Sequence, residues 1–300
     1  MEFNFSNFPN NDEQVDGMIT LMSDEKSVFP TLLETRPVYA EKDGYPLHVD
    51  LAIPEEALDL RRTYPVIFYV KGSSWDKQRT YRSLLNFAPF VRAGYIVAFI
   101  EYRPKQVAPI PAQIEDAFDA IRFLIDNKSR FHIDTDNMFV SGDSSGGHTA
   151  LSVFATWNTH KFDREEGELP MLRGCIDFYA PADMSMYAED FIEIIPELKE
   201  RFKKSVVAGV DIINDKKTAR KYSPQYMFKE GRKYPPVLIC HGSKDTLVPF
   251  KQSIRLFERL KEIGVDTEFI KVDGADHGKN LFWTDALFER VIAFLRKNTF

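Results

Sequence analysis

The feature that most limits the fold of this 300-residue chain is a regular alternation of short apolar runs with longer amphipathic segments. The runs YPVIFYV (64–70) and YIVAFIEY (95–102) have the length of strands that are buried on both faces. The segment PAQIEDAFDAIRFLIDN (111–127) carries apolar residues at helical spacing. Repeated strand–helix units of this kind predict an α/β fold, with a mostly parallel, doubly wound sheet and helices on both faces.

Two segments modify this plan. RPVYAEKDGYPLHVDLAI (36–53) predicts an antiparallel N-terminal hairpin that turns at Asp43-Gly44, a dipeptide typical of tight turns. An insertion at about 183–233 separates two predicted strands and is helical in character. Ligands bind beyond the carboxyl ends of the strands in such sheets, so we expect the insertion to form a small helical cap. The predicted organisation is an N-terminal segment, 1–36, which is open to joining the cap, and one α/β domain, 37–300.

Composition excludes several classes of partner. The net charge of −6 provides no basic surface for nucleic acid or for an anionic membrane. No apolar run is long enough to span a bilayer, and the acidic N-terminus lacks the pattern of a secretory signal, so we expect a cytoplasmic protein. The two cysteines, Cys175 and Cys240, lie in apolar runs and are expected to be buried free thiols.

The stretch GDSSG (142–146) lies between a predicted strand and a predicted helix. A sharp strand-to-helix turn raises its central residue above the sheet, and the flanking glycines leave room for neighbouring backbone. A phosphate-binding loop would instead need G-x-G-x-x-G or a lysine in the turn. We therefore predict that Ser144 is a nucleophile and that Ser145 contributes a backbone N–H group to an oxyanion hole.

A serine nucleophile needs a base, and His277 is the candidate that we favour. It lies in VDGADHGKN (272–280), a loop between the last predicted strand and the last helix, where functional side chains concentrate. His241 ends a strand and is expected to shape the next loop, whereas His148 is placed beneath the turn, in a packing or structural role. The remaining histidines lie far from this region or in a polar loop: His48, His132 and His160.

An acid must orient the base. Asp245 follows the penultimate strand, and the chain order Ser144, Asp245, His277 matches the order of a Ser…Asp…His hydrolase triad. Asp183 is the competing candidate, although it can instead cap the first turn of the insertion. Asp276 adjoins His277, and sequence neighbours rarely point at each other's rings.

The other oxyanion donors are expected after an earlier central strand, in VIFYVKGSSWDK (66–77). Ser73 and Ser74 of this loop are the predicted donors, together with the N–H of Ser145. Trp75 and Tyr102 are candidate aromatic contacts for the substrate, although core packing explains a buried aromatic residue equally well.

Several motifs in register resemble those of α/β-hydrolase fold esterases, in particular the feruloyl/acetyl-xylan-esterase-like and hormone-sensitive-lipase-like branches. The likeness runs from about 37 to 298 and rests on EYRP, PAQIEDAFDAIRFL, GDSSGGHTA, YSPQY, PPVLICHGSKDTLVP and DGADHG. The resemblance implies serine hydrolysis with no metal or other cofactor, and Ser144, Asp245 and His277 match the family triad.

The chain departs from these families in the oxyanion loop. Their usual pattern is His-Gly-Gly-x-Trp, whereas this chain has Lys71-Gly72-Ser73-Ser74-Trp75. Backbone N–H groups survive such a change. If the replaced glycine has a positive φ, Ser73 should store about 1 kcal/mol of strain or the loop should rearrange. We expect the oxyanion hole to be retained and the acyl side to be small.

These observations predict a carboxylesterase that hydrolyses short-chain acyl esters, whether acetyl, aryl or carbohydrate-linked. A prolyl-oligopeptidase-type peptidase and an arylformamidase share the motifs and stay open. A catalytically silent, ligand-binding relative is the alternative outside enzymes. The last strand is expected at a sheet edge, where it can pair with a second copy in a homodimer.

Overall fold

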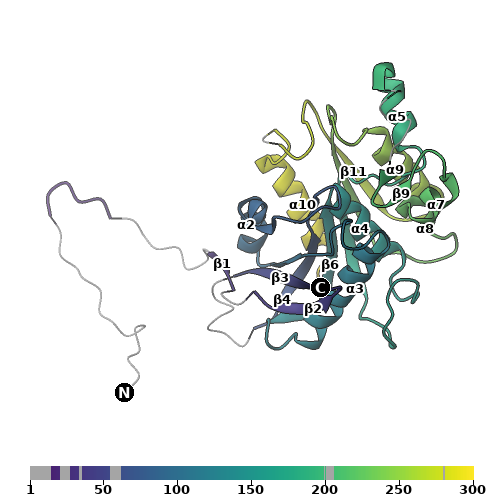
Figure 1. Ribbon diagram of the computed structural model, residues 1–300. Helices are drawn as coiled ribbons and strands as arrows, with labels where there is room; N and C mark the ends of the chain where they lie inside the picture. Colours follow the sequence, from purple (N-terminus) through teal and green to yellow (C-terminus); the bar gives the residue numbers. More distant parts are fainter. Residues whose placement is uncertain are drawn as a thin grey trace.

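A mostly parallel sheet forms the centre of the protein (Figure 1). The computed structural model describes residues 15–20, 28–33, 36–54, 62–198, 200, 206–279 and 281–300. Within these residues nine strands join in one sheet, with the order β1-β3-β5-β4-β6-β7-β10-β11 and β2 paired to β3. The strands from β5 to β11 are parallel, whereas β1, β2 and β3 pair antiparallel. The predicted mixed sheet is confirmed.

The bounds of the strands follow the predicted apolar runs closely. They are β1 (Pro30–Leu32), β2 (Val38–Lys42), β3 (Tyr45–Pro54), β4 (Tyr64–Val70), β5 (Ile96–Ile100), β6 (Ile133–Asp143), β7 (Leu172–Phe178), β10 (Val237–Gly242) and β11 (Thr267–Val272). β4 and β5 are buried almost throughout because both of their faces are covered by helices. The hairpin turns as expected at Asp43 and Gly44, whose φ values are 53° and 69°.

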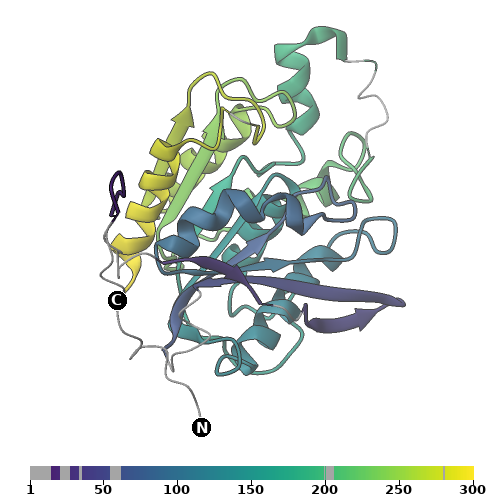
Figure 2. The ribbon, with the colours of Figure 1, turned by 90° about the vertical axis from the view of Figure 1, so that its left-hand side faces the viewer.

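Helices cover both faces of the sheet (Figures 1 and 2). α2 (Leu84–Arg92) and α10 (Asp285–Asn298) pack on one face, and α3 (Ala112–Asp126), α4 (Ser145–Ala155) and α9 (Lys251–Glu262) pack on the other. A short 3₁₀ helix, η2 (Thr80–Arg82), precedes α2. The two apolar clusters on either side of the sheet form the core, and both Cys175 and Cys240 are buried in it as free thiols.

The connection from β7 to β10 contains the segment 183–233, whose role as a cap stays a prediction. Its described elements are α5 (Tyr187–Ile194), η3 (Pro196–Leu198), β8 (Val206–Val207), β9 (Val210–Asp211), α7 (Lys216–Lys221) and α8 (Pro224–Met227). α5 stands out from the body in both views (Figures 1 and 2). Most of the N-terminal segment 1–36 lies outside the described residues, but Pro30–Leu32 forms β1 of the main sheet. None of the helices that the structure describes has the length and apolar character needed to cross a bilayer.

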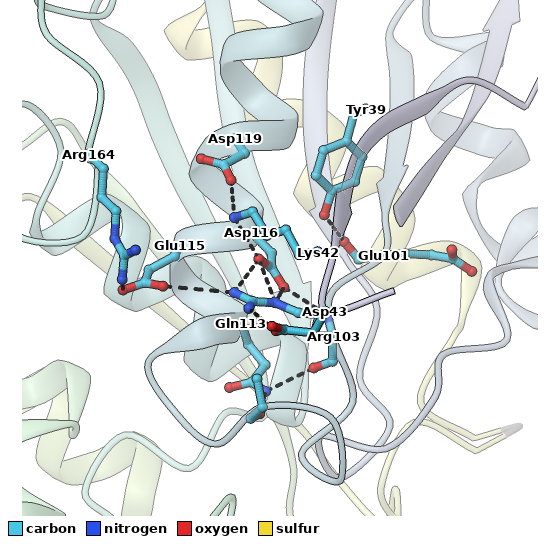
Figure 3. Close-up of polar contacts among 11 residues, drawn as sticks. Tyr39, Lys42, Asp43, Glu101, Arg103, Gln113, Glu115, Asp116, Asp119 and Arg164 are labelled. Atoms are coloured by element: carbon cyan, nitrogen blue, oxygen red, sulfur yellow. Dashed lines mark hydrogen bonds and ion pairs between the residues drawn. The ribbon is translucent and has the colours of Figure 1, made fainter. Parts of the chain in front are cut away.

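A buried ion-pair network anchors the hairpin to α3 (Figure 3). Arg103, in the EYRP motif, donates from Nε to both carboxylate oxygens of Asp116 at 3.1 and 2.9 Å and from Nη1 to Asp43 at 2.8 Å. Lys42 pairs with Asp116 at 3.0 Å and also with Asp119. Because Asp116 is fully buried, its two cationic partners compensate the loss of its hydration. The EYRP and α3 motifs therefore have a structural role here.

Candidate active site

Ser144 stands at the turn between β6 and α4, with φ of 53° and ψ of −126°. Close packing forces this turn to use glycine. A Cβ on Gly146 would lie 2.0 Å from the carbonyl oxygen of Val70, and one on Gly142 would lie 2.4 Å from that of Gly146. The strained backbone of Ser144 therefore places its side chain at the positive end of the α4 dipole, where first-turn N–H groups lack helical acceptors.

The structure brings Ser144, His277 and Asp245 together. Nε2 of His277 lies 2.9 Å from the Ser144 Oγ, and Nδ1 of the same ring lies 2.7 Å from Oδ2 of Asp245. Since a carboxylate only accepts, Nδ1 carries the proton that is donated to Asp245. Nε2 is then free to accept a proton from Ser144, which is the arrangement of an activated nucleophile.

Asp245 is held as a carboxylate by several donors. Its Oδ1 accepts from the N–H groups of Leu247 and Val248 at 2.8 and 2.7 Å, and its Oδ2 also lies 3.1 Å from Nε2 of His241. Burial opposes ionisation, but hydrogen bonds from His241 and His277 outweigh it and lower the pKa of Asp245 to about 2. Asp245 therefore keeps a negative charge beside the imidazole of His277.

His241 is a part of the site that the sequence did not reveal. We expected it to shape the loop after β10, and it does lie 3.1 Å from the Val248 carbonyl oxygen, but it also contacts Asp245. Its Nδ1 lies 2.7 Å from the Ser253 hydroxyl. The spacing of four residues between His241 and Asp245, across a turn at a strand end, is the only sequence signal of this contact.

The competing candidates have structural contacts. Oδ1 of Asp183 accepts from the N–H of Ser185 at 3.0 Å, as a residue that caps a turn does. Asp276 accepts from the N–H of Thr246 at 2.9 Å and so links the loop that carries Asp245 to the loop that carries His277. Nε2 of His148 lies 2.7 Å from the Tyr222 carbonyl oxygen, beneath the turn. His48, His132 and His160 make no contact with Ser144 that the described residues record.

The predicted oxyanion loop is fastened to β6 through Asp143. The backbone N–H of Gly72 donates to Oδ1 of Asp143 at 2.7 Å, Tyr69 donates to the same oxygen at 2.5 Å, and Nζ of Lys71 donates to Oδ2 at 2.5 Å. Burial opposes ionisation of Asp143, yet the charge of Lys71 and these hydrogen bonds lower its pKa. Lys71 therefore braces the loop at the position where the resembled families have histidine.

Ser145 fastens the other end of the loop with its hydroxyl. Its Oγ accepts from the N–H of Ser73 at 2.9 Å and from that of Trp75 at 3.2 Å. The expected backbone strain does not fall on Ser73. Positive φ values occur instead at Ser74 (57°) and Trp75 (58°), so these two residues carry the backbone strain of the loop.

Trp75 lies in the loop itself, and Tyr102 lies just after β5; both are buried. They are 5% and 0% exposed, Trp75 packs edge-on against His148, and the Tyr102 hydroxyl lies 3.0 Å from that of Ser73. Their predicted contact with substrate stays a prediction, as do the donor roles of Ser73, Ser74 and Ser145. In this structure the two aromatic residues support the loop.

A cavity of about 400 Å³ opens beside the triad. Its wall includes Asp143 and Gly278, the sequence neighbours of Ser144 and His277, and also Ser73, Tyr179 and Trp283. The Tyr179 ring lies 4.5 Å from that of His277, measured between centroids. A cavity of this volume is large enough for a small organic ligand.

Comparison with known proteins places these features in context. The sequence profile of the BD-FAE family matches residues 49–260. A probable isoprenylcysteine alpha-carbonyl methylesterase of Oryza sativa subsp. japonica is 25% identical over 83% of this chain and 58% of its own length. Esterase LipC of Mycobacterium tuberculosis is 27% identical over 72% of this chain and 53% of its own length. The chain thus spans little more than half of these relatives.

Two solved structures share the fold. A truncated carbohydrate esterase from gut microbiota has a TM-score of 0.75 and 23% identity, over 92% of this chain and 98% of its own. A propionate-bound esterase of Thermogutta terrifontis has a TM-score of 0.68 and 20% identity, over 88% and 93% of the two chains. These similarities identify the architecture as the α/β-hydrolase fold.

Proposed function

The chain belongs to the BD-FAE family, and from this premise we propose that it is a serine carboxylesterase that cleaves short-chain acyl esters. The observation that carries the proposal is the pair of contacts made by His277, 2.9 Å to Ser144 and 2.7 Å to Asp245. The esterases among its relatives support the same class of reaction.

Acylation begins when the Ser144 Oγ attacks the carbonyl carbon of the ester. Nε2 of His277 takes the hydroxyl proton, and the imidazolium that forms is stabilised by the Asp245 carboxylate. The tetrahedral oxyanion accepts hydrogen bonds from the backbone N–H groups of Ser145, Ser73 and Ser74. The Ser73 N–H would exchange its present acceptor, Oγ of Ser145, for the oxyanion.

Collapse of the tetrahedral intermediate breaks the bond to the alcohol. His277 returns the proton to the leaving alkoxide, so that the alcohol departs neutral and the acyl group stays on Ser144. Water then attacks the acyl-enzyme and gives a proton to His277. The second collapse releases the carboxylic acid and restores the Ser144 hydroxyl.

The acyl chain is proposed to be short, because Ser73 adds a hydroxymethyl side chain at a position where the resembled families have glycine. The propionate held by the Thermogutta terrifontis esterase supports a small acyl group. Rates with p-nitrophenyl acetate, butyrate and octanoate test this directly. We expect acetate or butyrate to be preferred, and a preference for octanoate would refute the small acyl side.

A covalent label tests the reaction itself. A fluorophosphonate should modify Ser144, and peptide mass spectrometry should separate this serine from its neighbour. Ser144→Ala should lose the label and reduce kcat for p-nitrophenyl acetate by about 10⁴-fold or more. Ser129→Ala, at an exposed serine, is the matched control and should behave as wild type. Wild-type activity in Ser144→Ala would overturn the proposal.

The charges of the cavity weigh against an aminopeptidase. Recognition of a free amine needs unpaired acids, whereas Asp143, on the cavity wall, is already paired with Lys71 at 2.5 Å. Prolyl-p-nitroanilide and formanilide therefore serve as comparison substrates for the peptidase and arylformamidase reactions. For each substrate the enzymatic rate is divided by the rate of uncatalysed hydrolysis. A larger ratio for either comparison substrate than for p-nitrophenyl acetate would refute the carboxylesterase proposal.

A further inference from the structure

The cavity beside the triad is strongly basic. Four cationic residues contribute to its wall, namely Lys71, Lys77, Arg79 and Arg82, and Asp143 is the acid among the residues that line it. Lys71 and Asp143 neutralise each other at 2.5 Å. Three positive charges remain, although the whole chain carries a net charge of −6. The local excess of positive charge is therefore opposite in sign to the protein as a whole.

The three remaining cations are not engaged by the fold. Across the described part of the chain, no hydrogen bond or ion pair joins the side chain of Lys77, Arg79 or Arg82 to another side chain or carbonyl group. All three residues are exposed, and they belong to the loop after β4 and to η2. Guanidinium and ammonium groups that are free at a cavity wall attract oxyanions and can bind them through charge-assisted hydrogen bonds.

The acids nearest to these cations line a neighbouring cavity. Asp50, Asp76 and Glu101 line it together with Lys77 and Arg79, and none of the three acids is among the residues that line the cavity beside Ser144. Asp76 lies 3.2 Å from Nζ of Lys105, and Arg36 pairs with both Asp50 and Glu101. Within the wall of the cavity beside Ser144, Asp143 is therefore the acid that offsets the four cations.

The rest of the wall suits a small acid. The amide of Asn86, which is partly buried, adds two neutral hydrogen-bond donors. Trp283 and Tyr179 provide aromatic surface, and the Trp283 indole N–H is already used by the Gly278 carbonyl oxygen at 3.1 Å. A volume of about 400 Å³ accepts an aromatic or sugar-sized acid.

We propose that this cavity is a carboxylate-binding subsite, so that the preferred substrate is an ester that also carries a free carboxylate. The inference rests on the proposed esterase function and names its substrate class. Arg79, Arg82 and Lys77 bind the carboxylate while the ester carbonyl reaches Ser144. The same positive charge attracts the anionic substrate from solution, which raises kcat/KM most at low ionic strength.

Matched ester pairs test the subsite. For the alcohol side, 4-acetoxybenzoate is compared with its neutral analogue 4-acetoxybenzamide. For the acyl side, monomethyl succinate is compared with methyl succinamate. Each kcat/KM is divided by the rate constant of hydroxide-catalysed hydrolysis, which removes differences in intrinsic reactivity. We expect the anionic member of at least one pair to be favoured, and the pair that shows the preference identifies which side of the ester carries the carboxylate.

Substitution should remove this preference. Each of Lys77→Gln, Arg79→Gln and Arg82→Gln should lower it about two- to fivefold, and the triple variant should lower it on the order of tenfold or more. In each variant kcat/KM should fall more for the anionic ester than for its neutral partner. Arg290→Gln, at an exposed arginine on α10, is the matched control and should keep the preference. Equal preference in the triple variant and wild type would overturn the subsite.

A binding measurement separates the subsite from catalysis. Calorimetry with 4-hydroxybenzoate on Ser144→Ala should give a Kd that rises on the order of tenfold when the three cations are also replaced. Neutral esters that are cleaved without any charge preference would refute the subsite and leave the esterase function standing. The opposite result is also distinguishable. If wild type neither cleaves esters nor reacts with the fluorophosphonate, but the triple variant binds 4-hydroxybenzoate more weakly, the esterase function is refuted and the subsite is supported.

Discussion

Asp177 is a buried acid beneath the turn at Ser144, and its replacement tests the electrostatics of this fold. Its side chain is 1% exposed, its Oδ1 accepts from the Ala180 N–H at 3.1 Å, and its Oδ2 has no hydrogen-bond partner among the described residues. A Cβ on Gly147 would lie 2.8 Å from Oδ1. Burial raises the pKa of Asp177 to about 8, against the opposing effect of the Ala180 N–H.

The sign of the pH effect follows from the proton count. Between an unfolded pKa of 3.8 and a folded pKa of about 8, the unfolded chain has lost a proton that the folded protein retains. Unfolding then releases a proton, so stability is fully present below the unfolded pKa and falls as pH rises through the folded one. The unfolding free energy falls by about 1.36 kcal/mol for each pH unit between the two pKa values. Compared with its value below the unfolded pKa, it is lower by about 2 kcal/mol at pH 5 and by about 5 kcal/mol at pH 7.5.

Asp177→Asn removes this titration while it keeps the acceptor for the Ala180 N–H. The new amide N–H₂ lacks a partner, but that penalty is the same at every pH. The difference in unfolding free energy between variant and wild type should therefore shift by about 3 kcal/mol in favour of the variant from pH 5 to pH 7.5. Urea denaturation at both pH values measures it, with Asp126→Asn at an exposed acid as the control. An equal difference at the two pH values would refute the reasoning.

Three further predictions concern the surroundings of the nucleophile. Lys71→Met should lower the unfolding free energy by about 3 kcal/mol, because it leaves the Asp143 carboxylate buried without its cation. Adding Asp143→Asn should recover much of this loss in urea denaturation, and a double variant no more stable than the single one would contradict the pairing. Ser145→Ala should cost about 2 kcal/mol in thermal denaturation, since two loop N–H groups lose their acceptor, and a wild-type midpoint would count against that contact. Burial lowers the pKa of His148 to about 4. Between about pH 6.5 and pH 4 only the unfolded chain binds the proton, so the unfolding free energy of wild type should fall by about 3 kcal/mol over this range. In His148→Phe this loss should disappear from urea titrations across the same range, and an unchanged pH slope would argue against a neutral buried imidazole.

The sheet was predictable because its signals are local. Strands buried on both faces need continuous apolar runs, and β4 and β5 have them. The turn at Asp43-Gly44 needs two positive φ values, which that dipeptide accepts readily. Neither feature depends on distant parts of the chain, so each can be recognised from the local sequence alone.

The grouping of Ser144, Asp245 and His277 was predictable for a different reason. Each follows a parallel strand, and the carboxyl ends of parallel strands meet at one edge of the sheet. Topology thus brings the three loops together before any side-chain contact is known. The contact of His241 with Asp245 was out of reach, because it depends on how the loop after β10 closes on itself.

The oxyanion loop shows why the remaining details needed coordinates. In the sequence, Lys71 and Ser73 are separate departures from the family pattern, and Ser145 has no evident connection with either. In three dimensions they act together: Lys71 holds the loop to Asp143, and the hydroxyl of Ser145 holds the N–H of Ser73. Positive φ at a non-glycine residue costs about 1–2 kcal/mol, a cost that Ser74 and Trp75 both bear. The hydrogen bonds at the two ends of the loop, of about 1 kcal/mol each, offset this cost in part. The loop is therefore held in shape by side-chain anchors, and two of the residues involved, Lys71 and Asp143, also line the cavity beside Ser144.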